Sequence, residues 1–140
     1  MPTEIRPCRS WELPRLVELG RHFFDEAKIG STFDPDGLLA HLNLLRTTDR
    51  LVAYVMAVDG VVVGAIVGCR AKQMMSTAVL VEELFWYVLP GYRGGTGGVR
   101  LMKALVEHAE RHADGIVMAR LTAGHTDLHR YYGKLNFTEI

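Results

Sequence analysis

Apolar residues recur along this chain with two different spacings, and the spacing predicts which segments are helices and which are strands. A spacing of three to four residues indicates an amphipathic helix, whereas a short run of β-branched and aromatic residues indicates a strand. Helices are expected at residues 11–28, 35–45, 99–113 and 126–135. Strands are expected at residues 3–8, 51–58, 61–69, 78–88, 115–122 and 137–140. The resulting order is β-α-α-β-β-β-α-β-α-β, without an internal repeat.

Local signals set several of the boundaries. Ser10 is expected to cap the first helix, and Asp34-Pro35 begins the second, because aspartate is a strong cap and proline fits the first helical position. Asp59-Gly60, between two strand-like runs, is a strong hairpin signal. The hairpin-linked strands predict an α/β (α+β) fold with a mixed, mostly antiparallel sheet flanked by helices, in a single domain spanning residues 1–140.

Composition narrows the classes of function. With 49% hydrophobic and 23% charged residues among 140, the chain is expected to be globular. Its 16 basic and 16 acidic side chains give no net charge, which argues against nucleic-acid binding. No apolar run reaches the ~20 residues of a membrane span, and no signal peptide precedes the first strand, so we expect a cytoplasmic location. Cys8 and Cys69 are too few for a disulfide framework or a zinc site.

The most informative segment is Arg93-Gly94-Gly95-Thr96-Gly97-Gly98, which joins an apolar strand to an amphipathic helix. Such a turn exposes backbone N–H groups at the positive end of a helix dipole, where a phosphate or pyrophosphate can bind. The P-loop pattern fails because no lysine follows the glycines, and the dinucleotide pattern G-x-G-x-x-G fails on spacing.

A third pattern, Arg/Gln-x-x-Gly-x-Gly/Ala, does fit. The segment resembles the acyl-CoA pyrophosphate loop of the GNAT N-acetyltransferase superfamily, with Thr96 at the first signature glycine and Gly98 at the second. The run 129–137 resembles the closing motif of the same family, where Tyr132 matches and Asn136 replaces the usual glycine. His125 stands where the family often has a CoA-contacting asparagine. The order of elements is similar to the family's from end to end, although the family usually adds one more strand.

The resemblance implies an N-acetyltransferase that uses acetyl-CoA as cosubstrate, without a metal, and a primary amine as acceptor. Val88 N–H would polarise the thioester carbonyl, and Tyr132 would protonate the leaving thiolate. For the side chain of Arg100, phosphate binding and a plain solvated position stay open. The implied acetyl-CoA-binding residues are Tyr87, Val88, Arg93, Gly94, Gly95, Thr96, Gly97, Gly98, Val99, Arg100 and His125.

Glu82 and Glu83 are adjacent acids within an apolar strand, so one should face each side of the sheet. Either is a candidate general base, directly or through a water, and the sequence does not choose between them. Because neither cysteine lies in a nucleophile setting, direct attack of the amine in a ternary complex is expected. His108 and His112 are spaced i, i+4 without a third ligand, so we expect surface residues there.

Two further possibilities stay open. A non-catalytic module that uses the same scaffold for acyl-CoA binding or assembly would also retain the glycine-rich turn. For the missing final strand two alternatives stay open: a homodimer completes the sheet through its C-terminal edge, or the fold is trimmed, and either is compatible with both functions.

Overall fold

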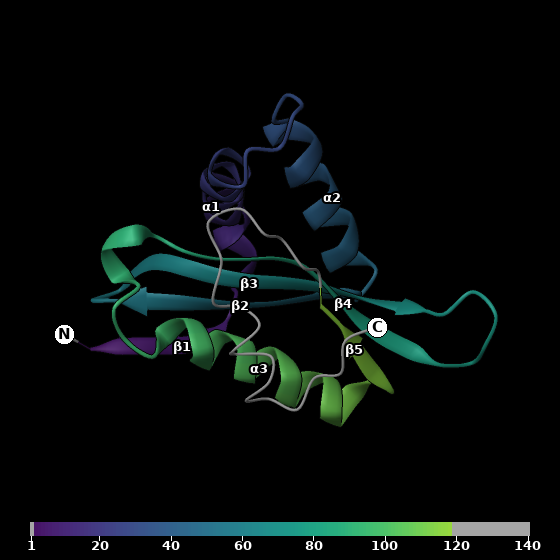
Figure 1. The fold of residues 1–140 in the computed structure, drawn as a ribbon. Helices are drawn as coiled ribbons and strands as arrows, with labels where there is room; N and C mark the ends of the chain where they lie inside the picture. Colours follow the sequence, from purple (N-terminus) through teal and green to yellow (C-terminus); the bar gives the residue numbers. More distant parts are fainter. Residues whose placement is uncertain (1, 119–140) are drawn as a thin grey trace.

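The computed structural model describes residues 2–118, and in this part of the chain a five-stranded sheet lies between two layers of helix (Figure 1). The strands lie in the order β1-β2-β3-β4-β5; all neighbours are antiparallel except β4 and β5, which are parallel. The strands are β1 (Thr3–Pro7), β2 (Leu51–Val58), β3 (Val61–Lys72), β4 (Val79–Val88) and β5 (Gly115–Val117). The helices are α1 (Leu13–Glu26), α2 (Pro35–Thr47) and α3 (Gly97–His112), with short 3-10 turns η1 (Ser10–Glu12) and η2 (Pro90–Tyr92). The mixed, mostly antiparallel fold expected from the sequence is confirmed.

Each face of the sheet has its own apolar core. On one face α1 packs against β3 and β4 through residues that include Leu16, Leu19 and Phe85, and α2 packs against α1 and β2. On the other face α3 packs through Leu101 and Leu105, both fully buried. The sheet is therefore buried on both sides, which explains the near-continuous apolar runs of β2 and β3.

The β2–β3 hairpin forms where Asp59-Gly60 predicted it. Asp59 and Gly60 have positive φ angles of 50° and 81°, as a tight two-residue hairpin turn requires. β3 is three residues longer than predicted and continues to Lys72, because Arg70, Ala71 and Lys72 pair with β4 in an arm that reaches beyond the helices. The added residues of this exposed arm do not form an apolar run, so the hydrophobic pattern did not predict that the strand continues.

A bulge interrupts the pairing of β3 with β4. Val67 pairs with Phe85 and Gly68 pairs with Glu83, so that Leu84 has no partner opposite it. The extra residue changes which side chains face which layer: Val81 packs in the α3 core, whereas Phe85 and Tyr87 pack in the α1–α2 core. Bulges of this kind are over-represented next to active sites.

The entry into the first helix differs from the sequence-based prediction. Ser10 does not cap the helix; it begins η1, and α1 begins only at Leu13. The carboxylate of Glu12 accepts from the backbone N–H of Arg9 at 2.8 Å and from both terminal nitrogens of Arg6, so a tertiary ion pair replaces the local cap. The Asp34 cap of α2 is confirmed, because its side chain accepts from Gly37 N–H at 2.9 Å.

The helix expected at 126–135, the strand at 137–140 and the end of the strand at 115–122 lie outside the described residues. None of the helices in residues 2–118 has the length and apolar character needed to span a membrane.

Candidate active site

The turn from β4 into α3 presents backbone N–H groups that have no acceptor in the described part of the chain. The first intrahelical bond of α3 runs from Arg100 N–H to Thr96 C=O at 2.9 Å, so the N–H groups of Gly97, Gly98 and Val99 precede the helical ladder. The Thr96 side chain does not cap them. Within residues 2–118 the start of α3 therefore has the free donors and the dipole that an anion needs.

Gly97 and Gly98 are glycines for different reasons. A Cβ on Gly97 would lie 2.5 Å from the sulfur and methyl carbon of Met56, so a side chain there would force the end of the buried Met56 side chain to move. A Cβ on Gly98 would meet Trp86 and Val88 only at 3.8 Å, an ordinary contact distance. Packing within the protein therefore does not require a glycine at position 98. The close approach of a ligand would explain the glycine.

A hollow of about 450 Å³ opens beside this turn. It is lined by Gly94 and Thr96 of the turn, by Arg100 of α3, and by Thr3 and Met56 of β1 and β2. Arg100 is exposed and forms no ion pair with a carboxylate of the described part of the chain, so its charge is available to a ligand.

Next to the turn, the edge of β4 has no pairing strand among residues 2–118. Leu89 N–H donates to Val63 C=O at 2.9 Å, and by the alternation of an antiparallel pair the N–H and C=O of Val88 point away from β3. On that side β5 pairs with β4 only from Leu80 to Glu82 within the described residues. Val88 N–H is thus placed at a strand edge as a potential donor to a carbonyl oxygen.

Arg93 is held in one position by α1 and β4. Its Nη1 and Nη2 donate to the two carboxylate oxygens of Glu26 at 2.8 and 2.7 Å, and its Nε donates to Val88 C=O at 2.6 Å. The guanidinium carbon lies 5.0 Å from the ring centre of Tyr87. The hydrogen bond to Glu26 raises the pKa of Arg93 above its ordinary value. This side chain is paired within the protein and does not offer an unpaired charge to a phosphate.

Tyr87 lies beneath this ion pair. Burial first, and then its hydrogen bond to Glu26 and the charge of that carboxylate, raise the pKa of Tyr87 to about 12. His22 of α1 stacks on its ring at 6.2 Å between centroids. The phenol is therefore protonated at neutral pH and acts as a fixed donor.

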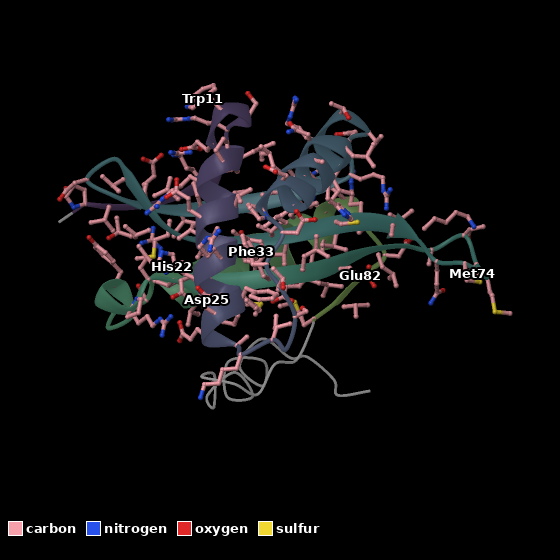
Figure 2. The ribbon with its side chains drawn as sticks, turned by 90° about the horizontal axis from the view of Figure 1, so that it is seen from above. Trp11, His22, Asp25, Phe33, Met74 and Glu82 are labelled. Carbon is pink, nitrogen blue, oxygen red and sulfur yellow. The ribbon has the colours of Figure 1, made fainter. Side chains whose placement is uncertain are left out.

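The two candidate bases are separated by the sheet. Glu82 is exposed and lies between α1 and the arm that carries Met74 (Figure 2). Glu83 is 8% exposed and shares the α3 face with Val81, two residues before it. The expectation that they face opposite sides of the sheet is confirmed.

The remaining candidate residues from the sequence add less to the description of the site. Tyr132 and His125 lie outside the described residues. His108 departs from the expected surface position: it is half-buried, and its Nδ1 lies 3.3 Å from the hydroxyl of Tyr54, while His112 is exposed. No group of three or more metal-ligating side chains occurs in residues 2–118.

A family model described as the acetyltransferase (GNAT) family matches residues 13–137. The chain belongs to this family. The match covers both the glycine-rich turn and the segment with Tyr132, and it places this GNAT protein among the acyltransferases. A comparison with proteins of curated function found no match.

Solved structures share the GNAT fold along almost the whole chain. A predicted acetyltransferase from Clostridium acetobutylicum, solved with acetyl-CoA, has a TM-score of 0.85 at 16% identity over 99% of this chain and 92% of its own. The aminoglycoside N-acetyltransferase AAC(6')-Iy, solved with a CoA-linked bisubstrate analogue, has a TM-score of 0.78 at 17% identity, with 99% and 92% covered. A ribosomal-protein-alanine N-acetyltransferase from Brucella melitensis biovar Abortus 2308 has a TM-score of 0.78 at 18% identity, with 100% and 94% covered.

Sequence reasoning missed Glu26 in this GNAT protein. An acid in the last turn of a helix opposes the helix dipole, and α1 has no basic residue in that turn. This mismatch was the available signal that Glu26 has a partner outside its own helix.

Proposed function

We propose that the protein is an N-acetyltransferase that moves an acetyl group from acetyl-CoA to a primary amine by direct attack in a ternary complex. The observation that carries the proposal is the turn at the end of β4, where three helix-start N–H groups lie next to an open strand edge. The N–H groups of Gly97, Gly98 and Val99 would hold the pyrophosphate, and Arg100 would add charge at the same hollow.

Val88 N–H is the proposed donor to the thioester carbonyl. As the amine nitrogen attacks the carbonyl carbon, negative charge develops on its oxygen, and a fixed N–H donor at that point lowers the barrier. The C–N bond forms, the C–S bond breaks, and the thiolate takes a proton, which the family resemblance assigns to Tyr132. The products are an N-acetylated amine and CoA.

Glu83 is the better placed of the two candidate bases. At about 3.3 Å per residue, five steps separate it from Val88 by roughly 16 Å, less the shortening at the bulge, whereas Glu82 is one step farther and faces the other layer. Glu83 would therefore receive the ammonium proton through a chain of waters, because a single water cannot bridge this distance.

The acceptor stays open within the class of primary amines. AAC(6')-Iy acts on aminoglycosides and the Brucella enzyme on a ribosomal-protein alanine, and this chain resembles both at similar identity. The cytoplasmic location and the homodimer through the C-terminal sheet edge remain predictions. A non-catalytic acyl-CoA-binding module is the second candidate, favoured by Thr96 at the first signature glycine.

Calorimetry with acetyl-CoA tests the proposal. We expect the wild type to bind and Gly98→Glu to lose binding, because the new carboxylate would lie among the N–H groups that hold the pyrophosphate. Gln73→Glu adds the same charge at the tip of the β3–β4 arm and should bind like the wild type.

Acetyl-CoA binding followed by turnover in a screen of primary amines supports the enzyme. Binding without turnover of any amine supports the non-catalytic module. If the wild type does not bind acetyl-CoA at all, both functions are wrong.

A further inference from the structure

The carbonyl of Val88, the last residue of β4, is bonded by a side chain and not by a neighbouring strand. Val88 C=O points away from β3, along the same edge as Val88 N–H, and accepts from Arg93 Nε at 2.6 Å. A carbonyl on this edge is the group that a neighbouring strand uses to extend its pairing beyond Glu82. Here the guanidinium satisfies the carbonyl and fills the space in front of it.

We infer that the Glu26–Arg93 ion pair is a strand stop, which keeps the edge of β4 open at Val88 for the pantetheine arm of the acyl donor. The inference rests on the proposed function and names two positioning residues for it. Because Val88 C=O is already bonded, a strand that pairs with β4 can end before Val88 without leaving that carbonyl unsatisfied, and Val88 N–H is then available to a ligand.

Glu26 belongs to α1, so this half of the strand stop comes from the helix layer on the opposite side of the sheet from α3. Arg93 alone is a long side chain with many rotamers, and the two bonds to Glu26 leave its Nε pointing at Val88. The pair is partly exposed, at 34% for the arginine side chain and 27% for the glutamate, but its two-bond geometry is the kind that holds an arginine in one orientation. The stop therefore fixes α1, which lies over Tyr87, to the end of β4.

The arginine itself is required, and its charge alone does not suffice. A lysine has a single terminal nitrogen and cannot donate to Val88 C=O while making two parallel bonds to Glu26. If Arg93 served only as a positive charge near the phosphates, lysine would replace it. The Arg93→Lys variant therefore separates a strand stop from a phosphate contact.

The test compares two probes on three variants. Acetyl-CoA carries both the pyrophosphate and the pantetheine arm, whereas ADP carries the adenosine and the pyrophosphate without the arm. We expect Glu26→Gln and Arg93→Lys each to weaken acetyl-CoA binding about tenfold, or about 1.4 kcal/mol, and to leave ADP binding within about twofold of the wild type. Calorimetry measures acetyl-CoA, and NMR titration of the amides of residues 94–99 measures ADP.

Glu12→Gln is the matched control. Glu12 forms an equivalent two-bond pair with Arg6, at 2.7 and 2.8 Å, before the start of α1 and outside the candidate site. The Glu12→Gln substitution removes a comparable ion pair but should change the affinity for neither acetyl-CoA nor ADP. Urea unfolding of all three variants shows whether each is folded. If Glu26→Gln does not fold, the comparison of the two probes is made with Arg93→Lys.

Equal weakening of ADP and acetyl-CoA would overturn the inference, because the pair would then support the phosphate loop. Wild-type affinity of Arg93→Lys for acetyl-CoA would overturn it as well. Failure of the proposed function is recognised separately, since it appears as absent acetyl-CoA binding by the wild type.

Discussion

At the scale of single residues, neighbours in the sequence have different tasks because the backbone turns them to different surroundings. A side chain on Gly97 would displace the end of Met56, whereas Gly98 has ordinary space around it. Glu82 is exposed, whereas Glu83 is buried on the opposite face of the sheet. In the proposed chemistry the backbone N–H groups of both glycines serve, whereas only Glu83 of the two acids has a role.

This difference predicts unequal effects on catalysis. Glu83→Gln should lower kcat by roughly 10²-fold or more, the usual loss when a general base is removed, because the amide cannot accept the ammonium proton. Acetyl-CoA affinity should be retained, since Glu83 lies on the strand away from the glycine-rich turn. Steady-state kinetics with a responsive amine, and calorimetry on the same variant, measure the two quantities.

Glu82→Gln is the paired control and should change kcat by less than about threefold, because its exposed carboxylate lies on the far side of the sheet. A larger loss of kcat in Glu82→Gln than in Glu83→Gln would assign the general base to Glu82. A loss of acetyl-CoA binding in Glu83→Gln would show that Glu83 supports the fold of β4, and its assignment as base would then be wrong.

At the scale of elements, the sequence predicted what local patterns determine and missed what tertiary contacts determine. The Asp34-Pro35 helix start and the Asp59-Gly60 turn are local signals, and both appear in the structure as expected. The entry into α1 depends on Arg6 from β1, and the bulge at Leu84 depends on β3, so neither could be derived from its own segment. The glycine-rich turn was found from sequence because its residues are contiguous, whereas Glu26 is 67 residues from Arg93.

The cap of α2 gives a prediction at this scale. Asp34→Ala should lower the free energy of unfolding by about 1 kcal/mol, because Gly37 N–H loses the acceptor that lies 2.9 Å away. Asp34→Asn keeps a side-chain oxygen in the same place and should stay close to the wild type. Urea unfolding of both variants measures the difference, and equal losses would show that the negative charge, and not the hydrogen bond, stabilises the helix start.

At the scale of the whole molecule, the sheet connects two layers that meet different parts of the proposed reaction. α1 lies over Tyr87 and supplies Glu26, while α3 begins at the turn and closes the opposite core (Figure 1). Val88 stands where the two layers and the sheet edge come together. A change in one layer can therefore alter the geometry of the donor site without contacting the donor.

The α3 layer also contains a titrating group that couples its packing to pH. His108 Nδ1 lies 3.3 Å from the Tyr54 hydroxyl of β2, and its Nε2 is buried without a hydrogen-bond partner within residues 2–118. Burial first, and then the nearby charges of His112, Arg70 and Arg111, lower the pKa of His108 below its ordinary value. The folded protein therefore holds this imidazole neutral at a pH where the unfolded chain would bind a proton.

Linkage then gives the direction of the effect on stability. Below the unfolded pKa of about 6.5 the unfolded state binds more protons at this site, so the free energy of unfolding should fall as the pH drops from 7.5 to 5. His108→Gln should reduce that slope, and His112→Gln should reduce it less, because it removes only one neighbouring charge. Urea unfolding of the wild type and both variants at several pH values measures the slopes. Equal slopes in the wild type and His108→Gln would show that His108 does not carry the pH dependence.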